Sequence, residues 1–98
     1  MNTQTLEKIG LSKAEIKVYL ALLGLGSVPS GKIVQETELR KSTVYESIRR
    51  LQEKGLVSYV IKGHQKIFQA EDPSKIMNII KEREEAFKKI LPQLVLNN

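Results

Sequence analysis

The spacing of apolar residues changes at Gly55, and this change limits the folds that the chain can adopt. Before Gly55, apolar side chains recur every three or four residues, as in Val44, Ile48 and Leu51, which is the period of an amphipathic helix. After Gly55, the stretch 57–61 places apolar or aromatic residues at every second position, which is the period of a strand. The sequence therefore predicts a mainly α-helical chain with a small β-hairpin, in the α+β class.

The stretch 40–54 is predicted to be one helix with two different sides. Its apolar stripe requires burial against neighbouring elements, and Gly55 ends the helix because glycine adopts the left-handed cap conformation at low cost. The side chains on the opposite side project outward, and they would contact base edges if this helix reads DNA. These outward residues are Ser42, Thr43, Tyr45, Glu46 and Arg49. Without further context, a polar side of this kind is most often only solvated.

A helix is predicted from the residues that follow Ser12. Ser12 and Glu15 are spaced as a capping box, in which each side chain accepts a hydrogen bond from a backbone N–H at the helix start. Apolar residues then keep a helical spacing as far as Leu23, after which Gly24 and Gly26 follow. Because glycine favours helix ends, these two residues are predicted to end the helix.

A second, shorter helix is predicted over residues 31–37. Ser30 lies where its hydroxyl would cap this helix, and Ile33 and Val34 are expected on its buried side. A turn through Glu38 then leads into the helix with the polar outer side. Two helices, a tight turn and a third helix of this kind are the elements of a helix-turn-helix.

Residues 57–70 are predicted to form a β-hairpin, which after a helix-turn-helix is a wing. Two runs rich in branched and aromatic residues flank Gly63 and His64, which fit a two-residue loop with glycine first. His64 is the only histidine, and the chain has no cysteine. We therefore expect His64 to contact solvent or phosphate and not to bind a metal or act in catalysis.

A long helix is predicted from Asp72 nearly to Leu96. Aspartate is a favoured cap, and the proline after it suits the first helical position. Apolar residues then follow a heptad spacing in which Arg83 takes the place of one apolar member. This seam consists of Ile76, Ile80, Phe87, Ile90 and Leu94. A helix of about 24 residues is longer than a domain of this size covers, which favours a homodimer seam over packing on the chain's own domain.

Positive charge is concentrated between Arg40 and Lys66. This segment has seven Lys or Arg and two Glu, so its net charge of +5 equals that of the whole chain. Such a concentration favours a partner with a phosphate backbone, although a merely solvated surface is the alternative. The candidates for phosphate contacts are Ser30, Lys32, Arg40, Lys41, Arg50, Lys62, His64 and Lys66.

Length and composition argue against several other functions. A chain of 98 residues is long enough for one module with a small core. The lack of cysteine excludes disulfides and thiolate metal sites. The sequence offers no nucleophile–base pair, glycine-rich phosphate loop or metal cluster, so we expect neither an enzyme nor a bound cofactor or metal. It also has no membrane-spanning stretch or signal peptide, so we expect a cytoplasmic protein that does not bind membranes.

Two stretches resemble a known family. The sequences LSKAEIKVYLALLGLG and STVYESIRRLQEKGLV are similar to the N-terminal winged helix-turn-helix domain of the archaeal TrmB family of transcriptional regulators, over about residues 6–72. The resemblance implies that the helix from Arg40 enters the major groove, that the wing contacts phosphates or the minor groove, and that a C-terminal helix pairs two subunits. The chain departs from the family at Glu38, where a small residue is common. It also lacks the sugar-binding domain of larger members, so we expect no small-molecule effector within this chain.

These observations predict a transcriptional regulator that binds double-stranded DNA sequence-specifically as a homodimer. Residues 1–71 would form the DNA-binding domain, and residues 72–98 the dimerisation helix. The alternative is a winged helix used for protein contact in the basal transcription or chromatin machinery. For Arg49, the alternative to reading a base is a weak surface ion pair with Glu46 or Glu53, one helical turn away.

Overall fold

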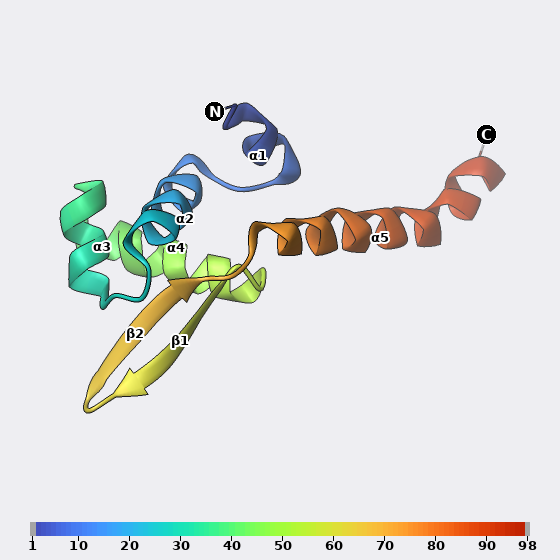
Figure 1. The fold of residues 1–98 in the computed structure, drawn as a ribbon. Coiled ribbons are helices and arrows are strands. Elements are labelled where there is room, and N and C mark those ends of the chain that lie inside the picture. Colours follow the sequence, from blue (N-terminus) through green and yellow to red (C-terminus); the bar gives the residue numbers. More distant parts are fainter. Residues whose placement is uncertain (1, 98) are drawn as a thin grey trace.

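The computed structural model describes residues 2–97 and has the predicted fold class, with helices, one antiparallel hairpin and a long last helix (Figure 1). The elements are α1 (Gln4–Ile9), α2 (Lys13–Leu25), α3 (Ser30–Thr37), α4 (Lys41–Glu53), β1 (Val57–Lys62), β2 (Gln65–Ala70), the 3-10 turn η1 (Pro73–Lys75) and α5 (Ile76–Leu96). Helices α2, α3 and α4 pack together, the hairpin extends to one side of them, and α5 projects to the other.

The helix starts follow the predicted caps in two of three cases. At α2, the Glu15 N–H donates to the Ser12 hydroxyl at 3.1 Å, and the Glu15 carboxylate accepts from the Ser12 N–H, so the capping box is confirmed. Asp72 accepts from the N–H of Ser74 at 2.8 Å, although the turn that it caps is a 3-10 turn ahead of α5. The prediction for Ser30 was wrong: Pro29 occupies the cap position of α3, and the Ser30 hydroxyl donates instead to Tyr45.

The turn between α3 and α4 depends on Glu38, which has a left-handed backbone with φ of 58°. A residue with a Cβ pays a steric penalty there, which glycine avoids. Thr37, buried in the core, supports the turn because its hydroxyl donates to the Ile33 carbonyl at 2.8 Å and accepts from the Leu39 N–H at 3.4 Å. The buried side of α3 is therefore Ile33 with Thr37, while Val34 is only half-buried.

The core lies where α2, α4 and the base of the wing meet. Its buried apolar residues are Leu11, Ile16, Val18, Tyr19, Leu22, Ile33, Val44, Ile48, Leu51, Leu56, Val57, Phe68 and Ile79. Tyr19 is 1% exposed, and its hydroxyl donates to the Glu71 carbonyl at 2.8 Å. Burial of these side chains is the main stabilising term. The Tyr19 bond joins α2 to the segment that follows the wing, and so fixes the hairpin to the helices.

The wing is a six-pair antiparallel ladder that begins at Val57 opposite Ala70 and ends at Lys62 opposite Gln65. Gly63 has φ of 63°, which a two-residue hairpin loop requires and which glycine adopts without strain. Only the base of the wing is covered by the helices. Tyr59 and Ile61 are 41% and 65% exposed, so the alternation that predicts a strand does not predict its burial.

Helix α5 packs on the core through its first turn. Ile79 is the one buried residue in α5, and Ile76 is half-buried against the core. Ile76, predicted in the dimer seam, therefore also packs on its own domain. The other four predicted seam residues are 39–51% exposed, namely Ile80, Phe87, Ile90 and Leu94.

Candidate nucleic-acid interface

The outward side of α4 carries the five residues predicted to reach base edges. Ser42, Tyr45, Glu46 and Arg49 are exposed, and Thr43 is half-buried. The opposite side is fixed in the core by Val44, Ser47, Ile48 and Leu51, which are all buried. Because the buried stripe sets the rotation of the helix about its axis, it also determines which side chains a partner can reach.

Arg49 lies between two carboxylates on this outward side. Its Nε donates to Glu46 at 3.2 Å, and its two terminal nitrogens pair with Glu46 and Glu53. Arg50 donates to the same Glu46 at 2.9 Å. Hydrogen bonds from Arg49, and to a smaller extent from Arg50, lower the pKa of Glu46 to about 2 and hold its carboxylate ionised. The surface pairing considered as the alternative for Arg49 is thus present, and its guanidinium must exchange partners before it binds a base.

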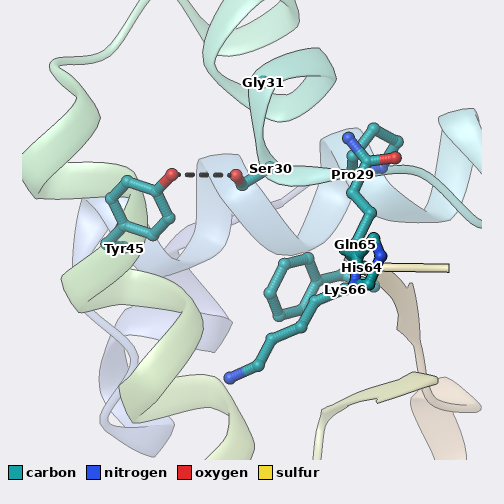
Figure 2. A pocket seen from close by; sticks show the side chains of 8 residues that line it. Pro29, Ser30, Gly31, Tyr45, His64, Gln65 and Lys66 are labelled. Atoms are coloured by element: carbon teal, nitrogen blue, oxygen red, sulfur yellow. Dashed lines mark hydrogen bonds between the residues drawn. The ribbon is translucent and has the colours of Figure 1, made fainter. Parts of the chain in front are cut away.

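A hollow of about 310 Å³ separates α4 from the wing (Figure 2). Tyr45 of α4 and Ser30 of α3 form one side of it, and they are joined by a hydrogen bond of 3.1 Å. His64 and Lys66 of the wing line the other side. Residues predicted separately for the reader helix, the second helix and the wing therefore surround one space.

Lys66 is held by an aromatic residue. Its ammonium lies 4.6 Å from the centroid of the Tyr59 ring, an attractive cation–π geometry. Tyr59 in turn packs against Phe68, with 5.9 Å between ring centroids. The wing thus orients a lysine at its exposed surface, while Lys62 and His64 are exposed beside the loop. The strand pattern gave no reason to assign Tyr59 this part.

The charge of the segment from Arg40 to Lys66 is partly balanced by a residue outside it. Lys54 pairs with Glu15 of α2, which is only 2% exposed. Burial opposes ionisation of Glu15, but hydrogen bonds from Lys54 and Ser12 outweigh it, so the pKa of this carboxyl lies below its ordinary value of 4.5. Lys54 therefore stabilises the fold, and a count along the sequence overstates the positive charge that this segment offers a partner.

The remaining candidates for phosphate contacts do not all lie at this hollow. Lys32, Arg40 and Lys41 are exposed around the start of α4 and the first turn of α3. Arg50 lies by a second hollow of about 260 Å³ on the other side of α4, together with Ser42, Thr43 and Glu46. Neither hollow could be predicted from the sequence, because each is lined by residues from separate elements.

Within residues 2–97, no cluster of three or more His, Cys, Asp or Glu is arranged to hold a metal ion. No helix in the same range is long and apolar enough to cross a membrane.

Residues 6–74 match the model of a family described as the sugar-specific transcriptional regulator TrmB. Among curated proteins, the chain is 29% identical over 79 residues to the sugar-sensing transcriptional regulator TrmBL1 of Pyrococcus furiosus. That alignment covers 81% of this chain but 23% of TrmBL1. The chain thus spans about a quarter of the length of this relative.

Two solved structures share the fold. A protein of Methanosarcina mazei, described as a possible transcriptional regulator, superposes with a TM-score of 0.76 and 21% identity, covering 99% of this chain and 88% of that one. TrmBL2, described as an archaeal chromatin protein with a novel mode of DNA binding, gives a TM-score of 0.81 and 21% identity, covering 93% and 36%.

Proposed function

The chain belongs to the TrmB family of transcriptional regulators, and from this premise we propose that it binds specific sites on double-stranded DNA as a homodimer. The family and the winged-helix fold are those of DNA-binding transcription regulators and not of enzymes. In the proposed complex, α4 lies in the major groove, and the wing contacts the backbone or the minor groove.

The observation that carries this proposal is the hollow between α4, α3 and the wing. Tyr45, Ser30 and Lys66 come from three elements and face the same space. A helix in the major groove needs flanking contacts to phosphates that fix its register and depth. Lys66, which lines the hollow, would supply one such contact, and the exposed Lys41 at the start of α4 and Lys62 at the end of β1 would supply others.

Base reading is assigned to Ser42, Thr43, Tyr45, Glu46 and Arg49. Arginine can donate two hydrogen bonds to guanine O6 and N7, and glutamate can accept from cytosine N4. When Arg49 leaves its carboxylate partners for a base, its guanidinium keeps its hydrogen bonds only where the correct base is present. This exchange would favour specific sites over random sequence.

The homodimer is assigned to the exposed stripe of α5. Phe87, Ile90 and Leu94 are 46–51% exposed, and a contiguous apolar surface of this kind is rare on a monomer. A second copy of the same helix would cover it by knobs-into-holes packing. Two reader helices would then meet half-sites about one DNA turn apart, or a multiple of this distance.

A binding selection tests this proposal. A random duplex pool is enriched on the protein, and the winning duplex and its scrambled version are titrated between 50 and 200 mM salt. We expect the selected duplex to bind more tightly and both affinities to fall steeply with salt. Equal affinity for both duplexes would contradict sequence-specific reading. No duplex binding even at low salt would favour the protein-contact alternative.

A further inference from the structure

One apolar stripe of α5 is buried at its start and exposed along the rest of its length. At about 100° per residue, Ile76, Ile79, Arg83, Phe87 and Leu94 all lie within one face of the helix. The first two pack on the chain's own core, since Ile79 is 8% exposed and Ile76 is half-buried. Phe87 and Leu94 are 51% and 49% exposed. Arg83 lies at the boundary, where an apolar seam residue is missing.

Arg83 contacts its own domain at Gly10, the residue that ends α1. A Cβ on Gly10 would lie 2.8 Å from the guanidinium carbon of Arg83, and closer still to one of its nitrogens. Gly10 also has φ of 116°, a backbone conformation that residues with a Cβ rarely adopt. Both the lack of a side chain and this conformation allow the planar guanidinium to lie directly over the backbone.

The same Gly10 is linked to the end of the reader helix. Its carbonyl accepts a hydrogen bond of 3.4 Å from Nζ of Lys54, the residue that caps α4. Lys54 also pairs with the buried Glu15 at the start of α2. The contacts therefore run from α5 through Gly10 to the carboxyl end of α4, outside the hydrophobic core.

We propose that Arg83 is a positioning residue that fixes the direction of α5 relative to α4, and so the placement of the two reader helices in the dimer. This inference rests on the homodimer of the proposed function. Beyond Ile79, none of the stripe's residues within the described range is buried or packed against the core. An apolar residue at position 83 would lengthen the dimer seam but remove the guanidinium from Gly10, and a polar residue in a seam often serves geometry at a cost in stability.

The distance between the two protomers' domains tests this directly. The chain has no cysteine, so one introduced cysteine carries a unique spin label. Glu36→Cys places it at an exposed position of α3. Double electron–electron resonance then gives the distribution of distances between the two labels. We expect one narrow peak in the otherwise unchanged protein and a broadened distribution with Arg83→Ala. Lys89→Ala, which removes an exposed cation from the same helix, should leave the peak narrow.

Two further variants separate positioning from general loss of stability. Arg83→Leu should tighten the dimer and yet broaden the distribution, which a merely structural role would not produce. Gly10→Ala should displace the guanidinium and broaden the peak, and adding Arg83→Ala to it should bring no further broadening. This comparison cancels the backbone strain at Gly10, because both backgrounds carry it.

The outcomes distinguish the inference from the function on which it rests. A narrow, unshifted peak in both Arg83→Ala and Arg83→Leu would overturn the positioning role while leaving the dimer intact. The absence of any dipolar signal in the protein with Arg83 would show a monomer, which would remove the homodimer and this inference together. DNA binding by such a monomer would still support the reader helix.

Discussion

Helices α4 and α5 are both amphipathic, but they differ in what covers their apolar sides. Helix α4 has 13 residues, of which Val44, Ser47, Ile48 and Leu51 are buried by the chain itself. Helix α5 has 21 residues, and only Ile79 is buried. A periodic apolar stripe thus predicts an amphipathic helix, but it does not tell whether the chain itself buries that stripe.

The polar sides of the two helices also carry different sets of ion pairs. On α4, Glu46, Arg49, Arg50 and Glu53 form one continuous set of ion pairs, of which Glu46 and Arg50 line the second hollow. On α5, Lys88 pairs with Glu84 at 3.0 Å. Exposed pairs of both kinds contribute little to stability. What distinguishes the set on α4 is that it lies on the outward side of the predicted reader helix.

The largest expected effect is the loss of stability when the buried stripe of α4 is truncated. Leu51 is fully buried, so Leu51→Ala should lower the free energy of unfolding by about 2–5 kcal/mol through lost burial and the cavity left behind. Urea unfolding followed by circular dichroism measures this change. Leu94→Ala, on the exposed stripe of α5, is the matched control at a concentration where the chain is monomeric. Equal losses in the two variants would refute the division between the two helices.

The second effect concerns the stripe of α5. Ile80→Asp combined with Phe87→Asp should raise the dimer dissociation constant at least about 100-fold, because two charges would enter an apolar seam. Light scattering at tens of micromolar should then give the monomer mass, while the thermal midpoint of the domain changes little. Lys81→Asp with Lys89→Asp adds the same charges on the opposite side and should leave the dimer intact. A dimer that survives the first pair of substitutions would contradict the seam.

The sequence predicted those parts of the fold that depend on neighbouring residues, and it did not predict those that depend on residues far apart in the chain. Local signals gave the helices, the hairpin and the capping box at Ser12, because each depends on residues within a few positions of one another. The cap expected from Ser30 was wrong because a distant residue, Tyr45, competes for its hydroxyl. The pairing of Glu15 with Lys54, 39 positions apart, leaves no periodic pattern for the same reason.

The candidate site was predictable as a list of residues but not as an arrangement. The outward side of α4 follows from helical periodicity alone. The hollow between Tyr45 and the wing requires the relative placement of α3, α4 and β2, which the core determines. Arg83 shows the same limit. The heptad spacing identified position 83 as one where an apolar seam residue is replaced by arginine, but only the folded structure shows that its guanidinium lies against Gly10.

The third prediction tests the ion pair between Glu15 of α2 and Lys54 at the end of α4. Glu15 has a lowered pKa in the folded chain, so its carboxylate stabilises the fold above the ordinary glutamate pKa, and this contribution is lost as pH falls through the folded value. Glu15→Gln should cost about 1–3 kcal/mol at pH 7. It should also flatten the decline of stability below pH 4.5, measured by urea unfolding at several pH values. An unchanged slope below that pH would contradict the role of Glu15.

The fourth effect compares two cations at the proposed interface. Arg49→Ala should weaken binding to the selected duplex roughly 5- to 150-fold and relax discrimination at one base pair per half-site. Lys66→Ala, which removes a cation held over Tyr59, should weaken all duplexes alike and reduce the salt slope by about one. Fluorescence anisotropy with the selected and scrambled duplexes measures both. Equal, small losses on the two duplexes with Arg49→Ala would remove Arg49 from the base-reading set.

The smallest expected effect comes from a comparison of two ion pairs of the same spacing, one on α4 and one on α5. Glu53→Gln removes one of the two carboxylate partners of Arg49 on α4, and Glu84→Gln removes one of the two carboxylate partners of Lys88 on α5. The loss of the Glu84 pair should change stability by only about 0.2–0.5 kcal/mol, and we expect a similarly small change for Glu53. On DNA the two should differ. Glu53→Gln removes a negative charge from the proposed reading side and leaves Arg49 paired with Glu46 alone, so affinity for random duplex should rise about two- to fivefold. Glu84→Gln should leave it unchanged. If both variants bind random duplex equally well, the outward side of α4 does not face DNA, and its polar residues are a solvated surface like those of α5.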